Sequence, residues 1–295
     1  MQAMLLFKKY STSSAYLLVC FAVFGVYSAA SSWASDFESP RTLALGGAGH
    51  AGPLLNDPIY LNPSFVSFNQ SYAIGLSILK YSNDPYHGRN YNLSLQDGRT
   101  EAFQAGVGYT VREDASLVHV VASRQVIPTV LSAGVGAKML FAPNQKTARD
   151  ITVSMGGAVT PWMQLALITD NLIQSDEGKA HGLYREIILG SKINVMGIVF
   201  AYIDPHLAPS VPGGNSFGHE MGLEFTLMAD LFLRLGTFRN SNVFYQSGLR
   251  GNGWGAGIGW VAPRISIDYA LSRVNDSRGG LQQTTSHNFG ATIFF

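Results

Sequence analysis

The sequence predicts an all-β protein, a transmembrane antiparallel β-barrel of about 14 strands. From residue 71 to the end of the 295-residue chain, segments of about ten residues carry apolar side chains at alternate positions. Only 13% of the residues are charged, against about 25% in an average soluble domain. Beyond residue 34 no apolar stretch approaches the roughly 20 residues of a spanning helix, so a membrane-spanning structure there must be a closed barrel.

The sequence predicts a signal peptide over residues 1–34. Two lysines precede an apolar run at 15–30, and Ser32 and Ala34 supply the small residues that a signal peptidase reads. An uncleaved membrane anchor is the alternative, although the run is shorter than a spanning helix. Cys20, the only cysteine, lies inside this run, so we expect the mature chain to contain neither a disulfide nor a thiolate site.

Prolines and glycines interrupt residues 35–69 every few positions, which predicts a compact, irregular segment rather than a strand. Residues 70–295 form the barrel domain, with an even number of strands as in bacterial barrels. The strand candidates are 71–80, 90–96, 102–112, 115–124, 129–141, 150–160, 162–169, 182–190, 193–203, 218–227, 229–238, 254–262, 264–272 and 286–295.

One segment shows how the two faces of each strand are assigned. In residues 254–262, Trp254, Ile258 and Trp260 share the face that we expect to contact lipid. The opposite face carries Gly255, Gly257 and Gly259, which suggests that something packs closely inside the barrel. Lipid contact is likewise predicted for Phe289, Ile293, Ile267, Phe225 and Phe103.

The lengths of the connections predict an orientation, with long loops on one side and tight turns on the other. Loops are expected at 81–85, 142–145, 204–217, 239–253 and 272–285. Tight turns are expected at Asp114, Thr160-Pro161, Met228 and Pro263.

Charged residues on the inward faces form a predicted polar network in the lumen. Its members are Lys138, Glu220, Glu224, Arg234, Arg264 and Asp268. They could line a polar pathway for solute. We favour a neutralising network that holds the N-terminal segment, because an unpaired charge in a poorly hydrated lumen is costly.

Catalysis, metals, cofactors and nucleic acid are not expected. The seven histidines are scattered without metal-ligand spacing, and no nucleophile elbow is present. The 20 Lys and Arg residues nearly balance the 19 Asp and Glu residues, so no basic field favours nucleic acid.

The last ten residues resemble the closing strand of bacterial outer-membrane β-barrels. Phe289, Ile293 and Phe295 share one apolar face, and the chain ends on an aromatic residue. An ordinary edge strand of a soluble sheet is the alternative for these residues alone. The resemblance implies that these three residues form a signal for the barrel assembly machinery, and that the protein lies among the lipids of the bacterial outer membrane.

The segment before the barrel resembles the amino-terminal signature of FadL-type outer-membrane transporters, which include TodX, and of their PorV-like relatives. The motifs are Arg41-Thr42-Leu43-Ala44-Leu45-Gly46-Gly47-Ala48-Gly49, then Asn56-Asp57-Pro58 and Asn62-Pro63-Ser64. The resemblance implies a 14-stranded barrel whose lumen holds residues 35–69 as a plug. Plug or gating roles are implied for Arg41, Gly46, Gly47, Gly49, Asp57, Asn62 and Pro63. The modest length of the chain favours the smaller PorV-like branch.

Two functions are compatible with this resemblance. One is transport of small hydrophobic molecules, such as fatty acids, across the outer membrane, without enzymatic activity. The other is a PorV-like scaffold for protein secretion or surface attachment, with a secreted protein as partner. Both require the same plug, so the sequence does not separate them.

Overall fold

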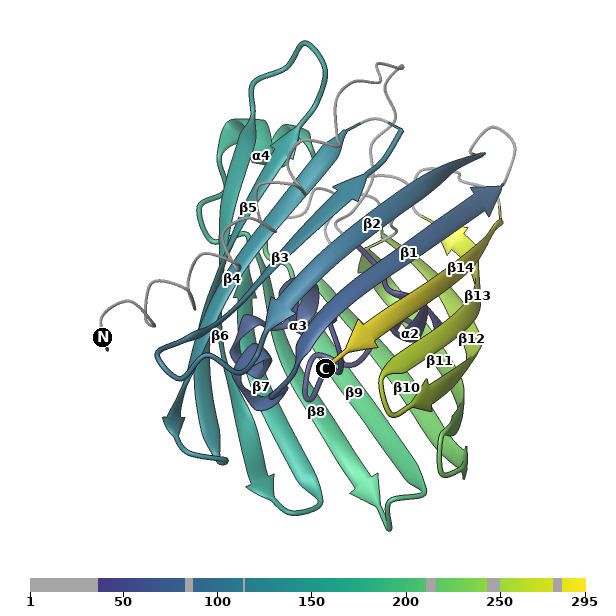
Figure 1. Ribbon diagram of the computed structural model, residues 1–295. Helices are drawn as coiled ribbons and strands as arrows, with labels where there is room; N and C mark the ends of the chain where they lie inside the picture. The colour runs from purple at the N-terminus through teal and green to yellow at the C-terminus, as the bar shows by residue number, and fades with distance from the viewer. Residues whose placement is uncertain (1–36, 83–86, 114, 211–215, 243–249, 278–282) are drawn as a thin grey trace, which may run out of the picture. The chain divides into compact units, whose positions relative to one another are not determined.

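The computed structural model describes residues 37–82, 87–113, 115–210, 216–242, 250–277 and 283–295, and within these it is a closed antiparallel β-barrel (Figure 1). Fourteen strands follow one another around the barrel, and β1 pairs with β14 to close it. The predicted fold class and strand number are confirmed. The predicted signal peptide lies outside the described residues and stays a prediction. Among the described residues, no helix is long and apolar enough to cross a membrane.

The strands are between 8 and 13 residues long. They are β1 (Tyr72–Ser82), β2 (His87–Asp97), β3 (Gln104–Val111), β4 (Ser116–Ile127), β5 (Leu131–Phe141), β6 (Ala148–Thr160), β7 (Met163–Asp170), β8 (Glu186–Val195), β9 (Val199–Leu207), β10 (Phe217–Met228), β11 (Leu231–Asn242), β12 (Arg250–Ala262), β13 (Ile265–Ser277) and β14 (Thr284–Phe294). Strand β1 alternates strictly between exposed and buried residues, which is the pattern of a wall with an apolar outside and a covered inside.

The predicted outward residues lie on the outer face. Phe289, Ile293 and Phe103 are more than half exposed, and Trp254 and Trp260 are exposed on the same face of β12. Soluble monomers rarely expose so many large apolar side chains, and this outer face suits contact with lipid.

Three short helices lie in the N-terminal segment, which we define as residues 37–71, and each begins at a proline. They are α2 (Pro40–Ala44), α3 (Pro58–Leu61) and the 3₁₀ helix η1 (Pro63–Phe68). Proline suits the first helical position because its missing N–H would have no helical partner there. A further helix, α4 (Asp176–Ala180), lies in the connection between β7 and β8.

The N-terminal segment contacts the inner face of the barrel on several sides. Helix α2 packs against β11 to β14, whereas η1 packs against β3 to β6. Figure 1 shows the segment, in purple, surrounded by the strands. The wall is glycine-rich where the backbones meet: a Cβ on Gly236 or Gly255 would lie about 2 Å from the backbone of residues 43–45. The predicted close packing on the glycine face of β12 is therefore confirmed.

The largest boundary error concerns β8 and β9. The turn between them is at Met196-Gly197, where both residues have positive φ, and not near residue 191. Asp204 and Pro205 lie inside β9, so the predicted loop from residue 204 begins too early. Pro205 is tolerated there because its missing N–H coincides with a gap in the ladder to β8, between the pairs Ile188–His206 and Ser191–Ile203.

Successive connections alternate between the two ends of the barrel. The end that carries both Tyr72 and Phe295 has short turns, for example at residues 161–162 and 263–264, and we call it the short-turn end. The opposite, long-loop end carries the connection 171–185 with α4. The connection 112–115 also lies at the long-loop end, so the prediction that grouped Asp114 with the tight turns is wrong; Asp114 itself is outside the described residues.

Packing on the glycine wall can be tested by adding a single methyl group. We expect Gly236→Ala to destabilise the barrel by about 1–3 kcal/mol, because its Cβ would overlap the backbone of residues 45 and 46. Gly136→Ala is the milder comparison, since its Cβ would meet only side-chain atoms of Pro63 and Val121, at 3.2 Å, and no backbone of the segment that closely. Urea unfolding of the two refolded variants measures the difference, and equal stabilities would contradict this packing.

Closure of the barrel can be tested at its last strand. Phe295 exchanges two backbone hydrogen bonds with Tyr72 and lies beside its ring, with centroids 6.1 Å apart. Replacing both Ile293 and Phe295 with aspartate should block insertion, because it puts charge on the lipid face. The control is the apolar exchange of both for leucine. Heat-modifiable migration on gels reports the folded fraction. A folded fraction of the aspartate variant equal to that of the wild type would contradict a role of the last strand in insertion.

Candidate functional site

The candidate site lies where the N-terminal segment meets the inner faces of β8 to β13. Arg41, in the first turn of α2, is 4% exposed, and its guanidinium reaches both the barrel wall and its own segment. Its Nε donates to Glu224 Oε2 at 3.2 Å, its Nη2 donates to the Tyr202 hydroxyl at 2.8 Å, and its Nη1 lies 3.5 Å from Asp57 Oδ2. One side chain therefore links α2, the start of α3 and two strands.

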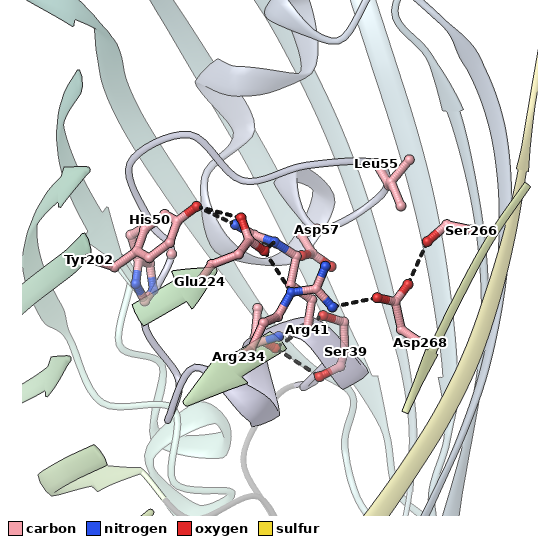
Figure 2. Close-up of polar contacts among 12 residues, drawn as sticks. Ser39, Arg41, His50, Leu55, Asp57, Tyr202, Glu224, Arg234, Ser266 and Asp268 are labelled. Carbon is pink, nitrogen blue, oxygen red and sulfur yellow. Dashed lines mark hydrogen bonds and ion pairs between the residues drawn. The ribbon is translucent and has the colours of Figure 1, made fainter. Parts of the chain in front are cut away.

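The network continues across the wall from Glu224 (Figure 2). Arg234 Nε donates to Glu224 Oε2 at 2.6 Å, and Arg234 also donates to Asp268, which accepts a further bond from Ser266 Oγ at 2.6 Å. Glu224 is thus shared between two arginines, one from the segment and one from β11. It is only 2% exposed, so these arginines take the place of water around its carboxylate.

Charge balance explains how this cluster tolerates burial. Lys192 lies over the rings of Phe200 and Tyr202, next to Glu224. The cations Arg41, Lys192 and Arg234 thus face the carboxylates Asp57, Glu224 and Asp268, three against three. These are the contacts expected of a neutralising network.

Two segment residues show the electrostatic consequence. Burial raises the pKa of the Asp57 carboxyl above its ordinary value, and Arg41 opposes that rise. Burial would lower the pKa of Arg41, but Tyr202, Glu224 and Asp57 together hold that pKa above its usual value. The guanidinium is therefore a fixed positive charge inside the barrel.

A second cluster lies on the other side of Tyr202, around His50. Asp204 Oδ2 accepts from the backbone N–H of Gly49 at 2.7 Å and of His50 at 2.9 Å, and it lies 3.0 Å from His50 Nδ1. His206 lies between two carboxylates, with Nδ1 3.1 Å from Glu186 Oε1 and Nε2 3.2 Å from Glu220 Oε2. All of these side chains are less than a tenth exposed.

Further charged groups complete this cluster. Arg250 donates to Glu186, and Ser241 Oγ donates to Glu220. Gly47 packs directly on the Glu220 carboxylate, where a Cβ would come within 2.5 Å of it. The positive φ of Gly47, +90°, and the absence of a side chain therefore both matter at this position.

Two cavities border both the N-terminal segment and the charged clusters. The larger of these two, of about 350 Å³, lies toward the short-turn end, and its apolar lining includes Phe37, Leu54, Leu55, Phe232, Val261 and Phe294. Arg41, Arg234 and Asp268 also line it. The smaller, of about 100 Å³, is lined by His50, His206, Glu186 and Glu220, together with Leu183 of the long-loop end.

The structure brings together most, but not all, of the residues singled out in the sequence. Arg41, Asp57, Glu224, Arg234 and Asp268 form the first cluster. Glu220 belongs to the second. Lys138 forms a separate pair with Asp170 and bonds Asn171 Oδ1 at 3.2 Å.

Arg264 is a correction. It lies in the exposed turn between β12 and β13, so the prediction that placed it in the lumen is wrong. The predicted strand begins at residue 264, one residue before β13, and this position still belongs to the turn.

The Asn62-Pro63-Ser64 element has a structural position that the sequence did not specify. Asn62 Nδ2 donates to the His50 carbonyl at 2.8 Å, and its Oδ1 accepts from the Ser64 hydroxyl at 2.7 Å and from the Ser64 backbone. Pro63 and Ser64 then pack on Gly134 of β5. The element thus joins two parts of the segment and fixes them to the wall.

Several residues at the centre of the site were not predicted. Tyr202, Asp204 and His206 lie on alternate positions of β9, and the early predicted end of that strand concealed their common inward face. Glu186 begins β8, whereas the predicted strand at 182–190 began and ended too early and its faces were not assigned. A correct turn at residues 196–198 would have put all of them on the inner face.

The ion pairs between segment and wall can be tested at Arg41. Arg41→Ala should cost about 3–5 kcal/mol of stability, because it leaves Glu224 and Asp57 with fewer partners in a buried site. Lys146→Ala is the control, since Lys146 pairs with Glu177 but is 86% exposed, and exposed pairs contribute about 1 kcal/mol or less. Chemical unfolding followed by tryptophan fluorescence compares them, and similar losses would contradict a specific role for Arg41.

Comparisons with known proteins give a structural likeness without a sequence match. No family model matches the chain, and no curated protein matches it. The solved structure of the Pseudomonas putida toluene transporter TodX is 11% identical, with a TM-score of 0.64, over 90% of this chain and 99% of that one. The CymD monoaromatic hydrocarbon channel is 12% identical, with a TM-score of 0.63, over 87% and 97%.

A Pseudomonas aeruginosa FadL homologue agrees, at 11% identity and a TM-score of 0.61 over 89% of this chain and 99% of that one. These neighbours are a toluene transporter, a monoaromatic hydrocarbon channel and a FadL homologue, and they share the fold that the amino-terminal signature predicts. The PorV-like branch stays a prediction. The chain has the fold of the FadL-type hydrocarbon channels.

Proposed function

We propose that this protein passes small hydrophobic molecules across the bacterial outer membrane. The observation that carries the proposal is the cavity of about 350 Å³ between the N-terminal segment and the barrel wall. Binding pockets for small molecules have volumes of this order and mostly apolar linings with a few polar groups. The fold likeness to hydrocarbon channels also supports transport of hydrophobic molecules. We infer an aromatic hydrocarbon or a fatty acid as the class of cargo.

The N-terminal segment is the plug in this proposal. It crosses the barrel between the two cavities, so a molecule that enters from the long-loop end must pass it to reach the larger cavity. Gly46, Gly47 and Gly49 all have positive φ, which gives this stretch a backbone path that other residues rarely adopt. A small displacement of the plug then opens the route.

The network around Arg41 favours the second candidate, a scaffold with a sealed lumen. A plug fixed by buried ion pairs needs no movement if the protein serves secretion or surface attachment. In that case the loops at the long-loop end, rather than the cavity, contact a partner protein.

Filling the cavity separates the two functions. Ser77 faces inward from β1 and lines the larger cavity, whereas its neighbour Ile78 faces outward and is 48% exposed. Transport predicts that Ser77→Phe lowers uptake of a labelled monoaromatic compound or fatty acid at least several-fold, while Ile78→Phe, the control on the same strand, leaves it unchanged. Uptake is measured in cells with matched surface levels of each variant.

A direct binding measurement completes the test. Purified wild-type barrel should bind the same compound in detergent, and Ser77→Phe should bind it more weakly. Unchanged uptake and no binding, together with capture of a defined secreted protein by the intact barrel, would overturn transport in favour of the scaffold.

A further inference from the structure

Three side chains from different parts of the chain converge beside the smaller cavity. They are His50 of the N-terminal segment, His206 of β9 and Glu220 of β10, and they are 6%, 3% and 6% exposed. One ligand atom from each, a ring nitrogen or a carboxylate oxygen, lies within 4.8 Å of the other two. Among the described residues, this is the group whose His and carboxylate donors converge closely enough to hold a metal ion.

Two of these donor atoms have no hydrogen-bond partner. His206 Nε2 and Glu220 Oε2 are both buried and lie 3.2 Å apart as an ion pair, but neither makes a hydrogen bond of good geometry to this or any other group. Buried polar atoms without partners are rare and costly. Their separation is close to the roughly 3.3 Å expected between two ligands of a tetrahedral metal ion with bonds of about 2.0 Å. A cation between them would satisfy both atoms at once.

The surroundings of His206 fit the same interpretation. His206 Nδ1 lies 3.1 Å from Glu186 Oε1, whereas His50 Nδ1 lies 3.0 Å from Asp204 Oδ2 and 3.8 Å from Glu220 Oε2. Metal-bound histidines almost always donate their second ring N–H to a carboxylate or carbonyl, which orients the ring and leaves the other nitrogen for the metal. In His206 that other nitrogen is the unpartnered Nε2, which faces Glu220.

The charge of the cluster also favours a cation. Glu186, Asp204 and Glu220 contribute three negative charges, and Arg250 contributes one permanent positive charge. With neutral imidazoles the balance of these groups is minus two. A divalent ion removes this excess without requiring that either histidine be protonated.

We propose that His50, His206 and Glu220 bind a divalent transition-metal ion of the Zn²⁺ class. Two imidazoles and one carboxylate are a set that Zn²⁺ accepts, and the fourth position faces the cavity of about 100 Å³, where water or another small ligand fits. Because His50 belongs to the N-terminal segment and the other two ligands belong to the wall, the ion fastens the segment to β9 and β10. This role holds whether the barrel transports cargo or serves as a scaffold.

The test uses the refolded full-length barrel in detergent, stripped with a chelator and then titrated with Zn²⁺. We expect one Zn²⁺ per chain by elemental analysis after desalting, and a higher temperature for the loss of the folded band on gels. Co²⁺ in place of Zn²⁺ should give the visible absorption of a four- or five-coordinate site.

The variants separate binding from folding. Glu220→Gln and His50→Gln keep the size of the side chains, and each should weaken Zn²⁺ binding by roughly 100-fold while the folded band remains in the absence of metal. His287→Gln is the control, since His287 is exposed on β14, away from the cluster. If one variant fails to fold, the other carries the comparison.

Several outcomes would overturn the proposal. One is a wild-type barrel that retains no stoichiometric Zn²⁺ after desalting, which would mean that His206 and Glu220 form an ion pair without a metal. Another is equal Zn²⁺ binding by wild type, Glu220→Gln and His50→Gln, which would place the ion elsewhere. Equal losses in His287→Gln would likewise remove the assignment to this cluster.

Discussion

The structure depends on one constraint: a charged, glycine-rich segment is enclosed by a barrel whose inner face must match it group by group. Arg41 is the centre of that match, because a single guanidinium bonds Glu224 and Tyr202 on the wall and Asp57 in its own segment. In a site with little water, neither the arginine nor the carboxylates could be buried alone. The polar inner face of β9 to β13 and the sequence of the segment are therefore parts of one arrangement.

The backbone of the N-terminal segment and the inner face of the barrel also fit each other in shape, independently of charge. Where α2 passes β11 and β12, the wall carries Gly236 and Gly255, and no larger residue fits at either position. The glycines that break the apolar–polar alternation are thus positions where the segment's backbone replaces a side chain. The outer face of the same strands keeps its tryptophans and isoleucines, since lipid places no such limit on it.

The alternation of side chains predicted the fold well, because a period of two is imposed directly by the strand geometry and each face meets a different solvent. It also put Glu224, Arg234 and Asp268 on the inner face. The alternation gave wrong predictions where a strand ends and where a proline lies inside a strand. Arg264 belongs to a turn, and Pro205 inside β9 was taken for a loop because a proline usually ends a ladder.

The pairing of the charges could not be derived from alternation. His50 and Asp204 are 154 residues apart in the chain, and their contact depends on where the segment's backbone turns inside the barrel. That path is set by Asn62, which bonds the His50 carbonyl, and by glycines with positive φ. A sequence pattern shows which wall residues face inward, but the meeting of segment and wall is determined by three-dimensional packing.

The energetics of this arrangement limit how the segment can move. Complete removal from the barrel would break the ion pairs of Arg41 and the Asp204 bonds to Gly49 and His50, and each broken buried pair costs about 3–5 kcal/mol. A conformational change that costs this much free energy is only rarely populated. The larger cavity borders residues 54 and 55, which lie outside both charged clusters, and Leu54 is 39% exposed. Movement confined to that part of the segment leaves the ion pairs intact, so it requires less free energy than movement of the residues that the ion pairs anchor.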